Sequence, residues 1–179
     1  MQIIYIILMV IGIIVSIILV VALFLPKKYS ILRETTINQP QEKIFTYIKY
    51  LKNQDSFSVW ATMDPDMKKE YRGEDGTVGF VSAWDSENKK VGKGEQKIIR
   101  IDAGKGVVSA LRFIKPFPGE AVAQFMTAPI DANTTKVSWQ LDSGMKYPMN
   151  FMLLIMNMDK MLGGDLEKGL ANLKGKMEN

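Results

Sequence analysis

The first 26 residues contain no charged side chain, and this stretch constrains the fold more than any other feature of the sequence. All 23 Lys and Arg residues and all 19 Asp and Glu residues lie after it. The run from Ile3 to Leu25 is interrupted only by the small residues Gly12, Ser16 and Ala22. A helix that rises about 1.5 Å per residue covers roughly 34 Å over this run, enough to cross the hydrocarbon core of a bilayer. We therefore expect a transmembrane anchor helix at 1–26 and a globular domain at 27–179.

A cleaved signal peptide is the main alternative for this segment. No Lys or Arg precedes the apolar run, the run is longer than an ordinary signal-peptide core, and its end reads Leu23-Phe24-Leu25-Pro26-Lys27 rather than small-x-small. These details favour an uncleaved, single-pass anchor. Because Lys27, Lys28 and Arg33 follow the helix, the positive-inside rule predicts that the domain faces the cytoplasm.

The chain has no His and no Cys, which excludes large classes of enzymes. Histidine-based triads, cysteine nucleophiles, and zinc, haem or iron–sulfur centres all need imidazole or thiolate groups. Asp64 and Asp66 are too few oxygen ligands for a calcium loop. We expect no metal and no cofactor. With a net charge of +4, interspersed acidic residues and no nucleic-acid motif, we also expect no nucleic-acid partner, and the basic cluster Lys89, Lys90, Lys93 and Lys97 suits a solvated face or anionic lipid headgroups.

The domain reads as one strand, short helices, six strands and a long helix. A β-branched strand at 29–37 leads into a helix at about 40–51, whose apolar stripe is Ile44, Tyr47, Ile48 and Leu51. A second short helix is expected at Phe57–Trp60. Turn-forming residues then separate six strands that short connections make antiparallel; we place them at 67–72, 77–85, 93–102, 106–114, 120–128 and 134–143.

The last predicted element is a long helix from Pro148 to about Lys174. Its apolar stripe runs from Phe151 to Leu173, and its first half is apolar almost all round, which calls for burial on more than one side. Gly163 and Gly164 permit a bend in the middle of this helix.

Motifs along these elements resemble a known superfamily. They are Asn38–Phe45 at the strand-to-helix junction, Phe57–Trp60 followed by Asp64–Pro65, Gly76–Gly79, Gly92–Glu95, Leu111–Phe113 and Tyr147–Met149. Together they resemble the START and birch-pollen-allergen-like (SRPBCC) superfamily, in particular its polyketide cyclase/dehydrase-type branch and a bacterial subgroup with an N-terminal membrane helix. The resemblance covers residues 29–175. It implies an α+β helix-grip fold, in which a curved antiparallel sheet of about seven strands surrounds the long C-terminal helix.

A curved sheet around a helix leaves an apolar cavity between them, which suits a hydrophobic guest. The predicted lining residues are Trp60, Phe80, Trp84, Leu111, Phe113, Phe125, Trp139, Phe151, Met152, Ile155 and Met156. Each of these side chains is also compatible with ordinary core packing. The methionines of this region favour a guest of variable shape, because flexible thioethers adapt to it.

Three functions are compatible with this reading. The favoured one is a membrane-anchored binding protein for a lipid or another small hydrophobic ligand. The second is a cyclase/dehydrase-like enzyme that uses the same cavity, although without His it needs a strongly shifted carboxylate or Lys. The third is a chaperone-activator-like protein-interaction module that uses the outer face of the sheet.

Overall fold

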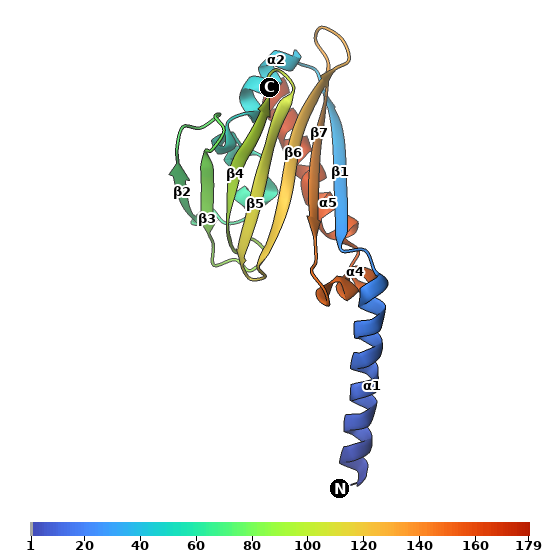
Figure 1. The fold of residues 1–179 in the computed structure, drawn as a ribbon. Coiled ribbons are helices and arrows are strands. Elements are labelled where there is room, and N and C mark those ends of the chain that lie inside the picture. Colours follow the sequence, from blue (N-terminus) through green and yellow to red (C-terminus); the bar gives the residue numbers. More distant parts are fainter. Residues whose placement is uncertain (1) are drawn as a thin grey trace.

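In a computed structural model that describes residues 2–179, the domain is built on a seven-stranded antiparallel sheet with the order β1-β7-β6-β5-β4-β3-β2 (Figure 1). The strands are β1 (Lys28–Ile37), β2 (Lys68–Arg72), β3 (Val81–Asp85), β4 (Lys93–Asp102), β5 (Gly106–Lys115), β6 (Gly119–Pro129) and β7 (Thr135–Gly144). Side chains alternate along each strand, so one face of the sheet is covered by the helices and the other face is exposed to solvent. In β7, Val137, Trp139 and Leu141 are buried, whereas Lys136 is exposed.

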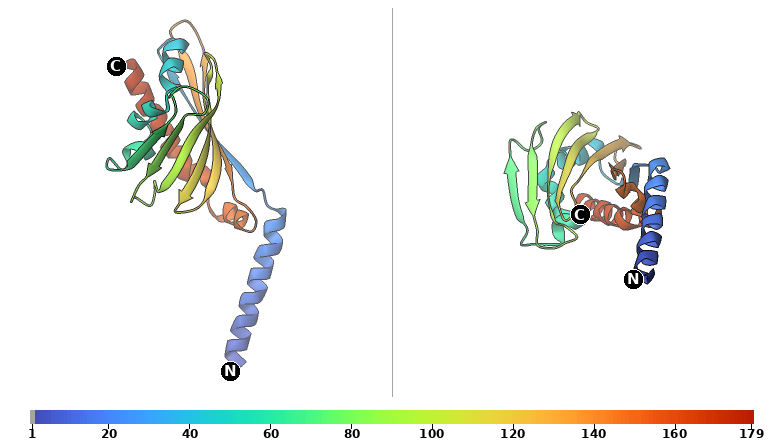
Figure 2. Two further views of the ribbon diagram at one scale, coloured as in Figure 1. Left: turned by 60° about the vertical axis from the view of Figure 1, so that its left-hand side comes forward. Right: turned by 60° about the horizontal axis from the view of Figure 1, so that its bottom comes forward.

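Helices cover the concave face of this curved sheet. The C-terminal helix α5 (Met158–Glu178) packs mainly on β1, and α2 (Gln41–Ile48), the 3-10 helix η1 (Leu51–Ser56) and α3 (Val59–Thr62) close the space beside it. Figure 2 shows the sheet curling around α5. This arrangement confirms the predicted helix-grip fold.

One predicted strand is shorter than expected. The segment 77–85 forms a strand only from Val81, because the residues before it make a turn. Gly79 in this segment has a φ angle of 100°, which a strand does not accommodate, and Gly73 and Gly76 in the turn before it have φ angles of 89° and 80°.

The C-terminal helix is interrupted, which differs from the continuous helix predicted over 148–174. The 3-10 helix η2 (Met149–Phe151) runs into α4 (Met152–Ile155), and then Met156 and Asn157 are extended before α5 begins. Asn157 caps α5, since its Oδ1 accepts a hydrogen bond from the backbone N–H of Lys160 at 2.9 Å. Gly163 and Gly164, where a bend was expected, lie inside α5.

The core lies between the sheet and the helices and contains a cluster of aromatic rings. Phe57, Phe125 and Trp139 are each at most 5% exposed. The ring centroids of Phe125 and Trp139 are 4.7 Å apart, and Phe57 packs edge-on against both. Edge-to-face and offset contacts of this kind are favourable for aromatic pairs.

The N-terminal helix α1 (Gln2–Phe24) projects away from one end of the domain (Figure 1). It is 23 residues long and apolar enough to cross a membrane, and almost all of its side chains are exposed. Ala22 is an exception, because its side chain is fully buried against the domain.

Candidate functional site

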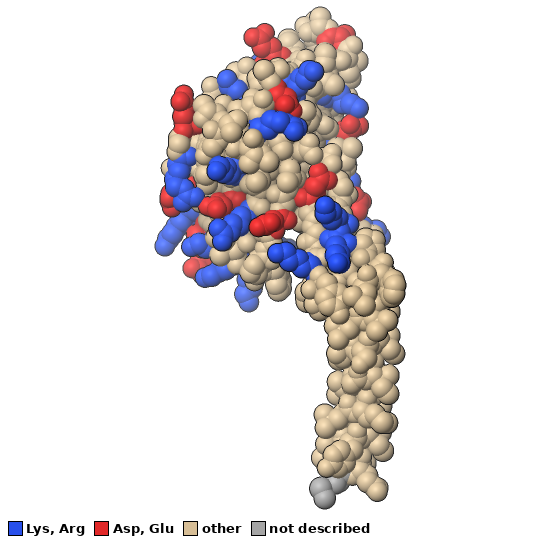
Figure 3. Space-filling model, in the orientation of Figure 1, with Lys and Arg blue, Asp and Glu red and all other residues tan. Residues whose placement is uncertain are grey.

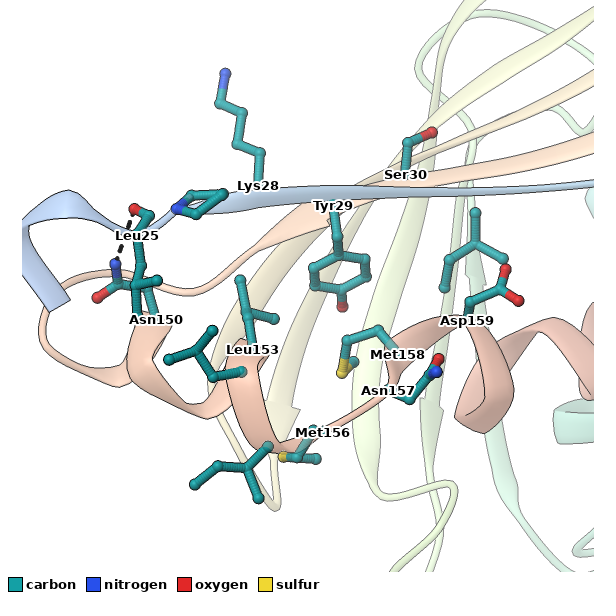
Figure 4. Close-up of a pocket in the computed structure, with 14 residues that line it drawn as sticks. Leu25, Lys28, Tyr29, Ser30, Asn150, Leu153, Met156, Asn157, Met158 and Asp159 are labelled. Carbon is teal, nitrogen blue, oxygen red and sulfur yellow. Dashed lines mark hydrogen bonds between the residues drawn. The ribbon is translucent and has the colours of Figure 1, made fainter. Parts of the chain in front are cut away.

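A groove opens where α1 meets the domain, between the start of β1 and α4 (Figure 4). Its volume is about 480 Å³, and its walls are mostly apolar. The lining residues are Leu25, Pro26, Lys28, Tyr29, Ser30, Ile31, Asn150, Leu153, Leu154, Ile155, Met156, Asn157, Met158 and Asp159.

Two local features of the chain form the groove. Pro26 cannot donate a backbone hydrogen bond to continue α1, so the chain leaves the helix and enters β1. On the other wall, the extended residues Met156 and Asn157 separate α4 from α5. Figure 4 shows the ring of Tyr29 projecting from β1 toward Met158 across this space.

Asn150 ties the groove to the end of α1. Its Nδ2 donates hydrogen bonds to the carbonyl oxygens of Ala22, at 2.7 Å, and Leu25, at 3.2 Å. The last carbonyl groups of a helix have no partner within the helix, so this amide supplies one. Because both Asn150 and Ala22 are fully buried, the contact fixes how α1 leaves the domain.

An ion pair bounds the opposite end of the groove. Arg33 in β1 donates from Nη1 and Nη2 to Oδ1 and Oδ2 of Asp159, each at 2.9 Å. These hydrogen bonds hold the pKa of Asp159 below its ordinary value, although burial acts in the opposite direction. The pair joins β1 to the first turn of α5, and the Asp159 carboxylate stays ionised near neutral pH.

The residues that the sequence predicts to line a cavity fall into three groups, of which the first two line the groove and form the packed core. Ile155 and Met156 line the groove. Phe80, Phe125 and Trp139 are buried core residues, with Trp60 edge-on to Trp139.

The remaining predicted residues are half-buried. Trp84 and Phe113 pack edge-on against each other, and Leu111 packs against the core. Phe151 and Met152 lie in η2 and α4 and are outside the groove lining.

Sequence reasoning missed most of the groove, including Leu25, Tyr29, Asn150 and Asn157. Two signals were available. Asn157 directly precedes Met158 and Asp159, and an Asn followed by an acidic first turn is typical of a helix start. Asn150 is also an amide within an apolar run. A buried amide almost always has a hydrogen-bond partner, so its position indicates such a partner.

Comparisons with known proteins identify the fold. No family model matches the chain, and no curated protein matches it in sequence. Three solved structures illustrate the similarity. A truncated norcoclaurine synthase from Thalictrum flavum is 14% identical with a TM-score of 0.59, covering 85% of this chain and 95% of that one. Major latex-like protein 151 from Panax ginseng is 12% identical with a TM-score of 0.59, covering 85% and 99%.

A protein from Chromobacterium violaceum is 14% identical with a TM-score of 0.57, and the match covers 84% of this chain and 97% of that one. At these identities the similarity concerns the fold. The domain is thus a helix-grip domain, and its fold is that of the Bet v 1/SRPBCC superfamily.

Proposed function

We propose that the protein is a membrane-anchored binding protein for a lipid or another small hydrophobic molecule. The observation that carries this proposal is the apolar groove of about 480 Å³ at the foot of α1. Sites for small molecules typically enclose about 300–1,000 Å³ and combine apolar walls with a few polar groups. Here Tyr29, Ser30, Asn150 and Asn157 are the neutral polar side chains that would orient a guest.

The position of the groove supports a membrane source for the guest. Leu25 and Pro26, which directly follow α1, form part of its wall. If α1 spans a bilayer, these residues lie near the membrane surface, so an apolar molecule has a short path from the bilayer to the groove. Lys27, Lys28 and Arg33 follow the span, and the positive-inside rule then orients the domain toward the cytoplasm.

The sequence-predicted lining residues have different roles in this proposal. Ile155 and Met156 contact the guest directly. The half-buried Trp84, Leu111 and Phe113 are available for a deeper part of the site, on the concave face. Phe80, Phe125 and Trp139 act as packed core that supports it.

The charges in the groove favour binding over acid catalysis. Its ionisable groups are Lys28, Tyr29 and Asp159. The hydrogen bonds from Arg33 lower the pKa of Asp159, so this carboxyl group carries no proton to donate near neutral pH. The fold itself accommodates small molecules elsewhere, since another norcoclaurine synthase structure, 13% identical, holds dopamine and hydroxybenzaldehyde.

The test is native mass spectrometry of the full-length protein, released from nanodiscs that contain a defined lipid mixture. We expect an adduct with the mass of one lipid or one small hydrophobic molecule, which survives removal of the bulk lipid. Protein that is free of adducts, and that takes up no apolar probe on titration, would contradict the proposal.

A further inference from the structure

We propose that the end of the domain from which α1 emerges docks on the surface of an anionic bilayer. The surface consists of η2, α4 and four connections, α1–β1, β3–β4, β5–β6 and β7–η2. This inference rests on the membrane span of α1, which is part of the proposed function. It adds a second contact between the protein and the membrane, besides α1 itself.

The strand register brings these four connections together. β1 begins at the α1 end of the sheet, and Lys28 pairs with Gly144 at the end of β7. In the same way Phe113 pairs with Gly119, and Lys93 pairs with Lys115 and Asp85. The β3–β4, β5–β6 and β7–η2 connections therefore all leave the sheet on the side of α1 (Figure 1).

Positive charge gathers at this end. The four connections and the strand ends beside them carry two acidic residues, Glu87 and Asp85, and Asp85 is paired with Lys93 at the start of β4. They also carry six exposed lysines, which are Lys27, Lys28, Lys89, Lys90, Lys115 and Lys146. The α3–β2 connection at the same end adds Asp64 and Asp66. Figure 3 shows lysine and arginine side chains along the lower rim of the domain, on the side of α1. Lysines next to a membrane are attracted to anionic lipid.

Large apolar side chains are exposed among these lysines. Phe117 at the tip of the β5–β6 connection is 83% exposed, and Met149 is 60% exposed. In α4, Leu154 and Ile155 are 60% and 68% exposed. Apolar side chains flanked by lysines are typical of segments that bury a few side chains among lipid headgroups.

The contact between Asn150 and α1 sets the depth of this surface. Because Asn150 bonds to the carbonyl groups of Ala22 and Leu25, η2 and α4 are held beside the end of the helix. Leu154 and Ile155 line the same groove as Leu25. With α1 in a bilayer, these exposed side chains are therefore held at the level of the membrane interface rather than far into the water.

The absence of cysteine makes a direct test possible. Single-cysteine variants of the full-length protein are labelled with an environment-sensitive fluorophore and reconstituted into vesicles with nitroxide-labelled lipids. Ile155→Cys and Phe117→Cys report on the docking surface, and Met9→Cys reports on α1. Ile130→Cys is the matched control, because Ile130 is 59% exposed in the β6–β7 connection at the opposite end.

We expect headgroup nitroxides to quench the labels at 155 and 117 several-fold more than the label at 130. Acyl-chain nitroxides should quench the label at 9. Quenching at 9 with equal, weak quenching at 155, 117 and 130 would overturn the docking surface and leave the anchor intact. Absence of quenching at 9 would overturn the anchor and the docking surface together.

The dependence on lipid charge is tested with the same labels. In vesicles that contain only zwitterionic lipid, quenching at 117 should decrease. A Lys115→Glu/Lys146→Glu variant should reproduce that decrease in anionic vesicles, whereas Lys105→Glu, at the opposite end, should not. Quenching that is independent of lipid charge and of these lysines would show that anionic lipid is not the partner.

Discussion

The side chain of Asn150 donates a hydrogen bond to the carbonyl oxygen of Ala22 at 2.7 Å, across 128 positions of sequence. This bond, together with the second one to Leu25, makes the junction between α1 and the domain a packed contact rather than a free tether. The groove is lined by Leu25, which directly follows α1, and by Asn150 of the domain, so both parts of the protein contribute to its walls. The orientation of α1 and the shape of the groove are therefore coupled.

Asn150→Leu should loosen this junction. The variant removes two donors and leaves buried carbonyl groups without partners, a loss of about 1–3 kcal/mol in the free energy of unfolding. Hydrogen exchange of the backbone from Lys27 to Tyr29 should accelerate, as measured by mass spectrometry on the full-length protein. Asn172→Leu is the control, because Asn172 bonds to the carbonyl of Phe57 at 3.0 Å, away from α1. Equal exchange in the parent and in Asn150→Leu would contradict the coupling.

The pair formed by Arg33 and Asp159 should make stability depend on pH. Hydrogen bonds from Arg33 lower the pKa of Asp159 in the folded state, so the stabilisation is present above the unfolded pKa of about 3.9 and is lost as the pH falls through the lower, folded value. The difference in unfolding temperature between the parent and Asp159→Asn should thus be constant near neutral pH and shrink in acid. Asp131→Asn, in the exposed β6–β7 connection, controls for the loss of one charge. A difference that grows in acid would contradict this assignment.

Two adjacent glycines of α5 should respond unequally to alanine. A Cβ at Gly163 would meet the guanidinium group of Arg33, so Gly163→Ala should shift Arg33 and weaken its pairing with Asp159, which offsets the gain in helix propensity. Nothing lies within 4 Å of a Cβ at Gly164, and Ala is favoured over Gly in a helix by about 1 kcal/mol. Gly164→Ala should therefore raise the unfolding temperature. Equal effects of the two substitutions would show that the contact between α5 and Arg33 does not require a glycine at position 163.

Substitutions in the core and in the groove should affect different quantities, namely stability and probe binding. Phe125 is 2% exposed and packs on Trp139, so Phe125→Ala should reduce the free energy of unfolding by about 3–5 kcal/mol. Ile155 is 68% exposed, so Ile155→Ala should change stability little and weaken binding of an apolar probe. Denaturant titration and probe titration of the same samples measure both quantities. A large stability loss in Ile155→Ala would identify it as core instead.

The sheet was predictable because the sequence signals that define its strands lie within each strand and the turns beside it. Turn-forming residues and alternating apolar side chains define the strands, and β4 spans Lys93–Asp102 as predicted. The groove was less predictable because it joins segments far apart in sequence, 25–31 and 150–159. Only Ile155 and Met156 were anticipated there. The inward-facing aromatic residues Phe125 and Trp139 show the same alternation whether they pack a core or line a cavity, so the pattern alone cannot separate the two roles.

The most direct test of the binding proposal compares two methionines of the same segment. Met156 lines the groove, whereas Met152, four residues earlier, does not. The affinity of the full-length protein for a fluorescent apolar probe and the denaturation midpoint are measured for Met156→Trp and Met152→Trp. The proposal predicts that Met156→Trp fills the groove and weakens probe binding at least several-fold with little change in midpoint, and that Met152→Trp leaves the affinity unchanged. Unchanged affinity in Met156→Trp, or an equal loss in both variants, would contradict it.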